Sequence, residues 1–124
     1  MQKAVPDSDR RRPTNRAGAR AFWQSRASAI LLLLLVPYAV FVLVSIAGRD
    51  AASVHRALTQ PWAALPLLAL IAVGAHHMRL GMREILEDYV RKPALTFWLL
   101  ANTVFCAAFQ LAAGFAVLRL WLWS

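Results

Sequence analysis

Three long stretches of the sequence contain no Asp, Glu, Lys or Arg: residues 27–48, 57–78 and 93–118. A helix needs about 20 apolar residues to cross the hydrocarbon core of a bilayer, so each stretch is long enough to span it. The sequence therefore predicts an all-α membrane protein with three transmembrane helices, at about 27–48, 62–86 and 95–118. Because the first run is longer than the apolar part of a cleaved signal peptide, we expect that helix to be retained.

The composition agrees with burial in lipid. Hydrophobic residues make up 60% of the 124 residues, more than a soluble domain of this size can hide from water. The net charge of +8 comes largely from arginines ahead of the first apolar run, where basic residues act as topology signals and contact anionic lipid headgroups. Nucleic acid is therefore not an expected partner. Residues 1–19 are polar and predict a mobile basic tail, and residues 20–124 predict a three-helix anchor.

The distribution of basic residues predicts the orientation. With three crossings, the N-terminal segment and residues 79–92 share one side of the membrane, and they carry 7 and 4 Lys or Arg. The other side carries only Arg49, Arg56 and Arg119. The positive-inside rule therefore places the N-terminus and residues 79–92 in the cytoplasm. The C-terminus is then expected in the periplasm, with the protein in the inner membrane.

The second predicted helix carries an unusual face near its cytoplasmic end. At about 100° per residue, Gly74 and Gly81 lie on the same face as His77. Glycine costs about 1 kcal/mol in a helix interior, and small residues permit close approach by another helix or by a flat ligand. An imidazole between two such gaps suits a haem lying against the helix, with iron bound to a ring nitrogen.

The same pattern has a plainer interpretation. A histidine near the membrane interface can be solvated or bonded to a neighbouring helix, and Gly74 and Gly81 can form a packing seam. Geometry alone leaves both interpretations open and favours the plainer one. His76 points about 100° away from His77 and is expected to lie at the interface or to support the site indirectly. His55 falls in the outer loop, where solvation is expected.

Asp88 and Tyr89 follow His77 by 11 and 12 residues, which is roughly 16–18 Å along a continued helix. This spacing places them at or just outside the cytoplasmic interface. A quinone headgroup needs hydrogen-bond donors for its carbonyl oxygens and a proton source during reduction. Tyr89 offers a phenol, and Asp88 can accept a proton or orient that phenol. On chemistry alone, a tyrosine of the interfacial aromatic belt beside a solvated acid is the favoured alternative.

The third predicted helix carries polar residues on one face. Asn102, Cys106 and Gln110 follow one another at intervals of four residues. This pattern favours packing against other helices, with the amides forming hydrogen bonds across an interface. Cys106 is the only cysteine, so no disulfide can form within the chain. A partner subunit is expected to cover the remaining polar groups.

Two segments resemble a known family. "HMRLGMREILEDYV" has a histidine, a glycine four residues later, and Asp-Tyr at plus 11 and plus 12. Together with "RASAI" at the start of the first span, it is similar to the small hydrophobic membrane anchor of succinate dehydrogenase, one of the two cytochrome b anchors of respiratory complex II. The likeness covers about residues 20–120, including the spacing of the spans.

The resemblance implies a set of roles. In the family, two different three-helix anchors hold haem b between them, and each gives one axial histidine, which here would be His77. Arg26 would pair with a haem propionate. Arg20 stands where some members have a histidine, and would serve a propionate or a phospholipid. Tyr89, with Asp88 beside it, would bind ubiquinone. The flavoprotein and the iron–sulfur protein of the complex would dock on the same side.

The function expected from these observations is that of a noncatalytic subunit. The chain would tether a succinate-oxidising enzyme to the membrane, help to bind haem b and complete a ubiquinone site. One alternative is an anchor of fumarate reductase, which runs in the opposite direction with menaquinone. Another is a small membrane scaffold protein without a cofactor.

Overall fold

The computed structural model describes residues 16–123, and the predicted tail at residues 1–15 lies outside this range. The described residues form four helices: α1 (Arg16–Ile46), α2 (Ala51–Leu58), α3 (Pro61–Tyr89) and α4 (Ala94–Leu122). Three of them, α1, α3 and α4, are long and apolar enough to cross a membrane. The predicted all-α class and the predicted number of membrane-spanning helices are therefore confirmed.

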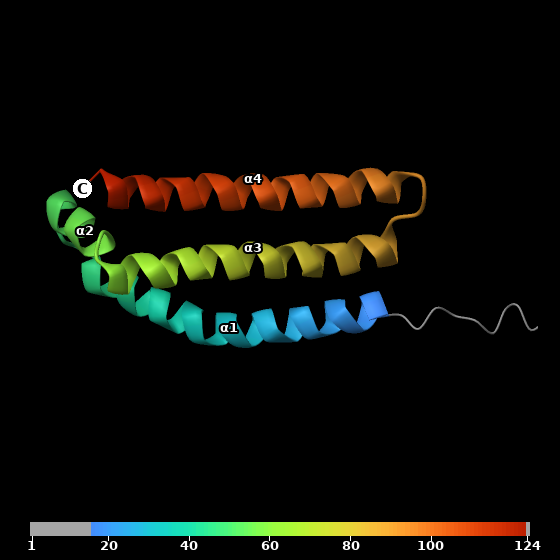
Figure 1. Cartoon of the computed structure of the whole chain (residues 1–124), viewed down its shortest axis with the longest axis horizontal. Helices are drawn as coiled ribbons and strands as arrows, with labels where there is room; N and C mark the ends of the chain where they lie inside the picture. The colour runs from blue at the N-terminus through green and yellow to red at the C-terminus, as the bar shows by residue number, and fades with distance from the viewer. Residues whose placement is uncertain (1–15, 124) are drawn as a thin grey trace, which may run out of the picture.

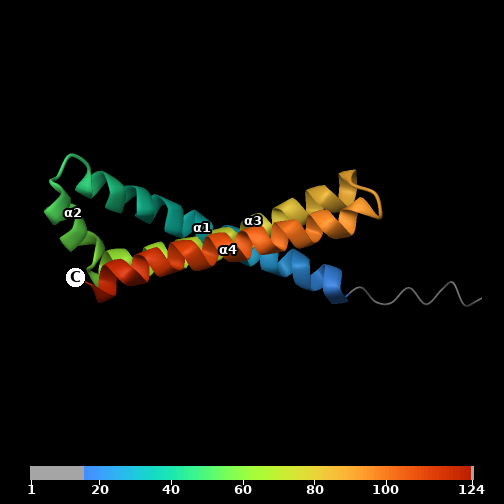
Figure 2. The same cartoon turned by 90° about the horizontal axis from the view of Figure 1, so that it is seen from above.

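The three long helices run antiparallel in chain order, with α3 in the middle (Figure 1). Helix α3 packs against both α1 and α4, whereas the described parts of α1 and α4 are not in backbone contact with each other. Figure 2 shows α1 crossing α3 obliquely, while α3 and α4 run nearly alongside each other. The start of α1, the end of α3 and the start of α4 thus share one end of the molecule, and α2 lies at the other (Figure 1).

Helix α1 begins earlier than expected from the sequence. Its first residue is Arg16, whereas the sequence predicts a span from about residue 27 and a tail that includes residues 16–19. The prediction used the loss of charge as the helix boundary, but charge limits only the part of a helix that lies in hydrocarbon. Residues 16–26 are rich in alanine and arginine, both good helix formers, and contain no proline. The helix therefore continues beyond the apolar span.

The loop expected between the first two spans contains the short helix α2. Its N-cap is Asp50, whose carboxylate accepts a hydrogen bond from the Ser53 backbone N–H at 3.2 Å. Hydrogen bonds from the side chain and backbone of Ser53 lower the pKa of the Asp50 carboxyl. His55, expected in a loop, is therefore helical. It lines a cavity with Arg119 and Trp123 at the C-terminal end of α4.

The buried residues within the described range are mostly small. Helices in lipid approach closely where small side chains lie at the contact. Large apolar side chains gain no hydrophobic stabilisation there, because lipid tails are as apolar as the helix interface. The buried set contains Ser28, Ala39, Val42, Ile46, Ala63, Ala64, Ala75, Leu80 and Cys106. Most large apolar side chains of α1 and α4 are instead exposed, so these surfaces must face lipid or partner subunits.

Polar contacts join α3 to its neighbours. The Asn102 side-chain amide donates to the Arg79 carbonyl oxygen at 3.0 Å, which confirms a cross-helix hydrogen bond from α4 to α3. Cys106 is buried beside Asn102, with its Sγ 3.6 Å from the Asn102 Oδ1. At the other end, the Tyr38 hydroxyl donates to the Trp62 carbonyl oxygen at 2.7 Å. These bonds hold α3 in register with both flanking helices.

Candidate functional site

The His77 side chain extends from α3 and is bonded to α1. Its Nδ1 lies 2.8 Å from the hydroxyl oxygen of Ser28, across 49 residues of sequence. Ser28 is only 5% exposed and is the only polar residue buried in the described range. The Ser28 hydroxyl also lies 3.0 Å from the Ser25 carbonyl oxygen one turn earlier in α1. The imidazole is therefore anchored at one nitrogen by a buried group of the neighbouring helix.

The second ring nitrogen of His77 is not used within the described part of the chain. Its Nε2 has no hydrogen-bond partner among residues 16–123, and the side chain is partly exposed. A neutral imidazole that donates from one nitrogen keeps a lone pair on the other. His77 can thus offer a ligand nitrogen to a group from outside the chain.

The two glycines near His77 have different surroundings. A Cβ added at Gly81 would meet no other side chain or helix within 4 Å, so the surface beside it is open. A Cβ added at Gly74 would lie 3.9 Å from the Leu32 Cδ2 of α1, which is ordinary van der Waals contact. The gap expected from the sequence is therefore fully open beside Gly81, and beside Gly74 it is bordered by α1.

An apolar groove of about 400 Å³ runs past Gly74 between α3 and α4. Its walls are almost entirely apolar, and they include aromatic rings from α4 as well as the α3 side chains next to Gly74. The lining residues are Leu70, Ile71, Gly74, Ala75, Met78, Phe105 and Phe109. The glycine-bearing face of α3 therefore opens onto a surface that a flat apolar ligand or an apolar helix can cover.

The two arginines predicted to bind propionates lie on α1. Arg26 is exposed and two residues from Ser28, so it lies at nearly the same depth as His77; its Cζ is 5.2 Å from the centroid of the Phe22 ring. Arg20 is exposed as well, but eight residues from Ser28, or about 12 Å along the helix. Arg26 is therefore the nearer of the two cations to the level of the imidazole.

Tyr89 and Asp88 lie at the end of α3 that the start of α1 shares (Figure 1). Tyr89 is the last residue of the helix and 84% exposed, and Asp88 is exposed too. Neither side chain forms a hydrogen bond or ion pair with another described residue. Because α3 is continuous from His77 to Tyr89, the two residues are about 18 Å apart along its axis.

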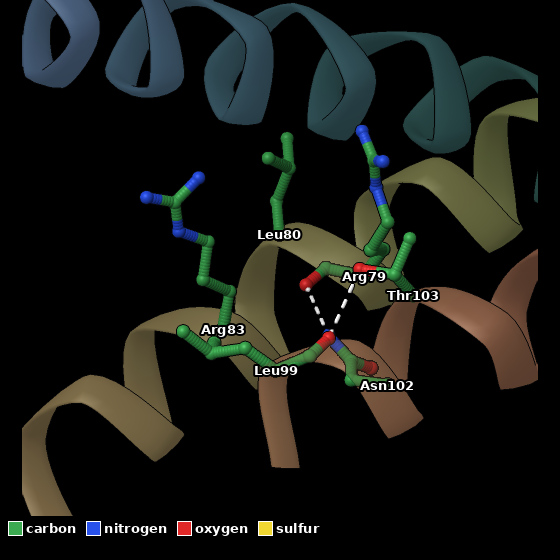
Figure 3. A pocket seen from close by; sticks show the side chains of 6 residues that line it. All are labelled: Arg79, Leu80, Arg83, Leu99, Asn102 and Thr103. Atoms are coloured by element: carbon green, nitrogen blue, oxygen red, sulfur yellow. Dashed lines mark hydrogen bonds between the residues drawn. The ribbon is translucent and has the colours of Figure 1, made fainter. Parts of the chain in front are cut away.

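Another face of α3 carries a polar pocket that was not predicted from the sequence. Arg79, Arg83, Asn102 and Thr103 line a cavity of about 190 Å³ between α3 and α4, and Figure 3 shows both guanidinium groups extending from α3 on the same side. Arg83 is paired with Glu87 at 2.7 Å. His76 lines neighbouring cavities on the same part of α3. Basic residues thus occupy a face that contains neither glycine.

Ser28 was also missed as a site residue. A single serine between alanines carries no signal of its own, because serines in membrane helices often bond only to their own backbone. Its pairing with His77 depends on how α1 and α3 are aligned, which the order of residues does not reveal. A polar residue at the expected depth of the imidazole, two positions after Arg26, was the only available indication.

Comparison with known proteins adds an independent line of information. Residues 2–115 match the family model described as succinate dehydrogenase/fumarate reductase transmembrane subunit. A protein from Rickettsia felis, named succinate dehydrogenase hydrophobic membrane anchor subunit, is 27% identical over 74 residues. That alignment covers 60% of this chain and 62% of the relative, so the chain matches less than two thirds of the relative's length. No solved structure matches the chain significantly.

Proposed function

The chain belongs to the succinate dehydrogenase/fumarate reductase transmembrane subunit family, and on this premise we propose that it is the hydrophobic membrane anchor of a succinate:ubiquinone oxidoreductase. It tethers a flavoprotein subunit and an iron–sulfur subunit to the inner membrane. With a second anchor subunit it binds haem b, and with the iron–sulfur subunit it completes a ubiquinone site. The chemistry of succinate oxidation belongs to the other subunits.

The observation that supports the haem assignment is the hydrogen bonding of the two ring nitrogens of His77. Its Nδ1 is anchored at 2.8 Å from Ser28, and its Nε2 has no partner within the described residues. The open surface beside Gly81 and the position of Arg26, two residues before Ser28, fit a flat ring with acidic substituents. His77 would give one axial nitrogen, and Arg26 and Arg20 would neutralise propionates. A bound haem would supply one-electron transfer between the iron–sulfur clusters and quinone.

The second axial ligand is proposed to come from the partner anchor. In this chain the surface beside Gly81 is open, and the described helices line the apolar groove beside Gly74 without filling it. A partner helix bringing a histidine to this face would cover the groove and enclose the ring. Burial of the haem edge by two chains would keep water from the iron and tune its reduction potential.

The quinone assignment rests on the exposed end of α3. The Tyr89 phenol can donate a hydrogen bond to a quinone carbonyl oxygen, and the Asp88 carboxylate can accept a proton or orient the phenol. Both groups are free of hydrogen bonds and ion pairs with other described residues, at the end of the molecule where α1 begins. A ligand that approaches this end can therefore reach Tyr89 without displacing an internal bond.

Purification of the chain with its partner subunits tests this function. We expect the wild-type complex to contain a flavoprotein and an iron–sulfur protein, and to give a b-type signal in a reduced-minus-oxidised visible spectrum. If the purified chain contains neither haem nor these subunits, it is instead a cofactor-free scaffold. The same preparation, assayed with ubiquinone and with menaquinone, separates succinate oxidation from the fumarate-reducing alternative.

The orientation is also open to direct measurement. The charge distribution supports a cytoplasmic N-terminus, because residues 79–92 and the N-terminal segment carry 11 of the 14 Lys and Arg. We expect a reporter enzyme that works only in the periplasm to be active when fused to the C-terminus. The same reporter fused after residue 92 is expected to be inactive. The reverse pattern would contradict the proposed topology and would separate Tyr89 from the cytoplasmic side.

A further inference from the structure

We propose that Ser28 is a positioning residue for His77, whose ring it fixes with hydrogen on Nδ1 and a free lone pair on Nε2. This inference rests on the proposed function, in which Nε2 is the atom that binds haem iron. It assigns a role to a residue of α1 that does not touch the iron. The role is to select one of the two neutral tautomers of the imidazole and to fix the orientation of the ring.

The hydroxyl group of Ser28 makes two close contacts. The Ser28 Oγ lies 2.8 Å from the His77 Nδ1 and 3.0 Å from the Ser25 carbonyl oxygen. A carbonyl oxygen can only accept a hydrogen bond, and a hydroxyl has a single hydrogen to give. If the hydroxyl donates to Ser25, its oxygen is left to accept, and His77 must then donate from Nδ1.

Counting bonds separates the two possible arrangements. With hydrogen on Nδ1, both close contacts of Ser28 are hydrogen bonds, one accepted from His77 and one donated to Ser25. With hydrogen on Nε2, the hydroxyl must donate to Nδ1, and the contact with the Ser25 carbonyl is no longer a bond. Because Ser28 is 5% exposed, water cannot readily replace the lost bond. The structure therefore favours the form with a free Nε2.

The packing around Ser28 fixes the position of its hydroxyl relative to the His77 ring. Ser28 lies on the buried side of α1, and its hydroxyl is oriented by its own helix. His77 lies within the continuous helix α3, so two packed backbones define the line from Ser28 to Nδ1. The ring is attached through its Cβ to α3 and bonded at Nδ1 to α1, so it is held at two points. Its Nε2 is thus directed before any ligand arrives, which lowers the cost of binding iron.

This bond also affects the iron through the ring. A hydrogen bond donated from Nδ1 makes an imidazole a stronger electron donor at Nε2, and a stronger donor stabilises the ferric state. The bond to Ser28 is therefore expected to hold the haem reduction potential lower than it would be without the hydroxyl. A residue with only a packing role would not shift the potential in this direction.

The test is made in the assembled complex with Ser28→Ala. We expect a haem potential shifted to more positive values and a haem affinity about tenfold or more weaker. Ser28→Thr keeps a hydroxyl and is expected to stay near wild type, whereas Ser28→Val has the shape of threonine without the hydroxyl and is expected to behave like Ser28→Ala. Ser45→Ala is the matched control, since the Ser45 hydroxyl donates to the Val42 carbonyl of the same helix at 2.7 Å and joins no second helix.

The comparison of threonine with valine decides the matter even if the alanine variant fails to assemble. A wild-type potential in Ser28→Thr with a raised potential or lost haem in Ser28→Val supports the inference. Equal potentials and equal haem contents in these two variants would overturn it. His77→Ala separates this failure from that of the proposed function. If haem is lost in His77→Ala while Ser28→Val matches wild type, only the role of Ser28 is wrong.

Discussion

The His77→Ala complex is expected to lose the b-type haem signal, or to show it in an altered form with the iron bound by one protein ligand. Replacing the ring removes the Nε2 nitrogen, which has no hydrogen-bond partner among the described residues and is the proposed ligand of the iron. Haem content and the reduced-minus-oxidised spectrum of the purified complex measure the effect. Addition of free imidazole should restore part of the signal, because the space of the missing ring stays open.

His76→Ala is the matched control for this substitution. The two histidines are neighbours in sequence, but His76 lines two cavities that His77 does not line. One includes Ser28 and Gln24, and the other includes Cys106 and Gln110. Its loss removes a histidine from the same depth without touching the proposed ligand, so the haem spectrum should remain. An unchanged spectrum in His77→Ala would refute the ligand assignment. Loss in His76→Ala alone would transfer the assignment to that residue.

Tyr89→Phe is expected to reduce electron transfer from succinate to ubiquinone roughly ten- to hundredfold, because it removes one hydrogen bond to a polar ligand group. The phenyl ring keeps the shape, and the side chain is 84% exposed, so the fold should not change. Reduction of an artificial dye that accepts electrons from the iron–sulfur protein should stay at the wild-type rate. The ratio of the two activities is the quantity to measure.

Tyr38→Phe provides the control for that experiment. The Tyr38 hydroxyl donates to the Trp62 carbonyl oxygen at the opposite end of the molecule from Tyr89. Removing it costs one cross-helix hydrogen bond, worth about 1 kcal/mol, without reaching the proposed quinone site. Both activities should remain in Tyr38→Phe. Equal loss of quinone and dye reduction in Tyr89→Phe would mean that the substitution disturbs assembly, and the quinone role would be wrong.

The three spans could be predicted because the bilayer imposes one strong condition on the sequence. Apolar length alone fixes the number of crossings. The ends of α1 could not be predicted in this way, since Arg16 to Arg26 are compatible with a helix and incompatible only with hydrocarbon. Helix α2 was missed because eight residues are too few for a periodic pattern to stand out. The signal that was available is Asp50 three residues before Ser53, an N-cap pair.

For the candidate site, the residues that share a face of one helix could be predicted from the sequence, whereas contacts between helices could not. His77, Gly74 and Gly81 could be grouped from spacing, because one helix determines which of its residues share a face. Ser28 could not be added to this group, since its contact with His77 depends on the crossing of α1 and α3. The alignment of two helices is set by the packing of many small residues rather than by a local motif. For the same reason the sequence did not reveal that Leu32 borders the face beside Gly74.

The partner-dependent assignments remain predictions. The second axial ligand, the propionate contacts of Arg26 and Arg20, and the quinone contacts of Tyr89 and Asp88 all need groups outside this chain. What the chain itself contributes is a set of prepared surfaces: an anchored imidazole, an open face beside Gly81 and an exposed phenol. Each becomes a site only when a second protein chain or a cofactor covers it.

A structure of the assembled complex, determined with its cofactors, measures the central relation directly: the distance from the His77 Nε2 to the nearest metal. We predict a haem iron within bonding distance of that nitrogen, the ring lying over Gly81, and the Nδ1 still bonded to Ser28. A partner side chain or lipid acyl chain filling the surface beside Gly81, with no iron near Nε2, would contradict the account.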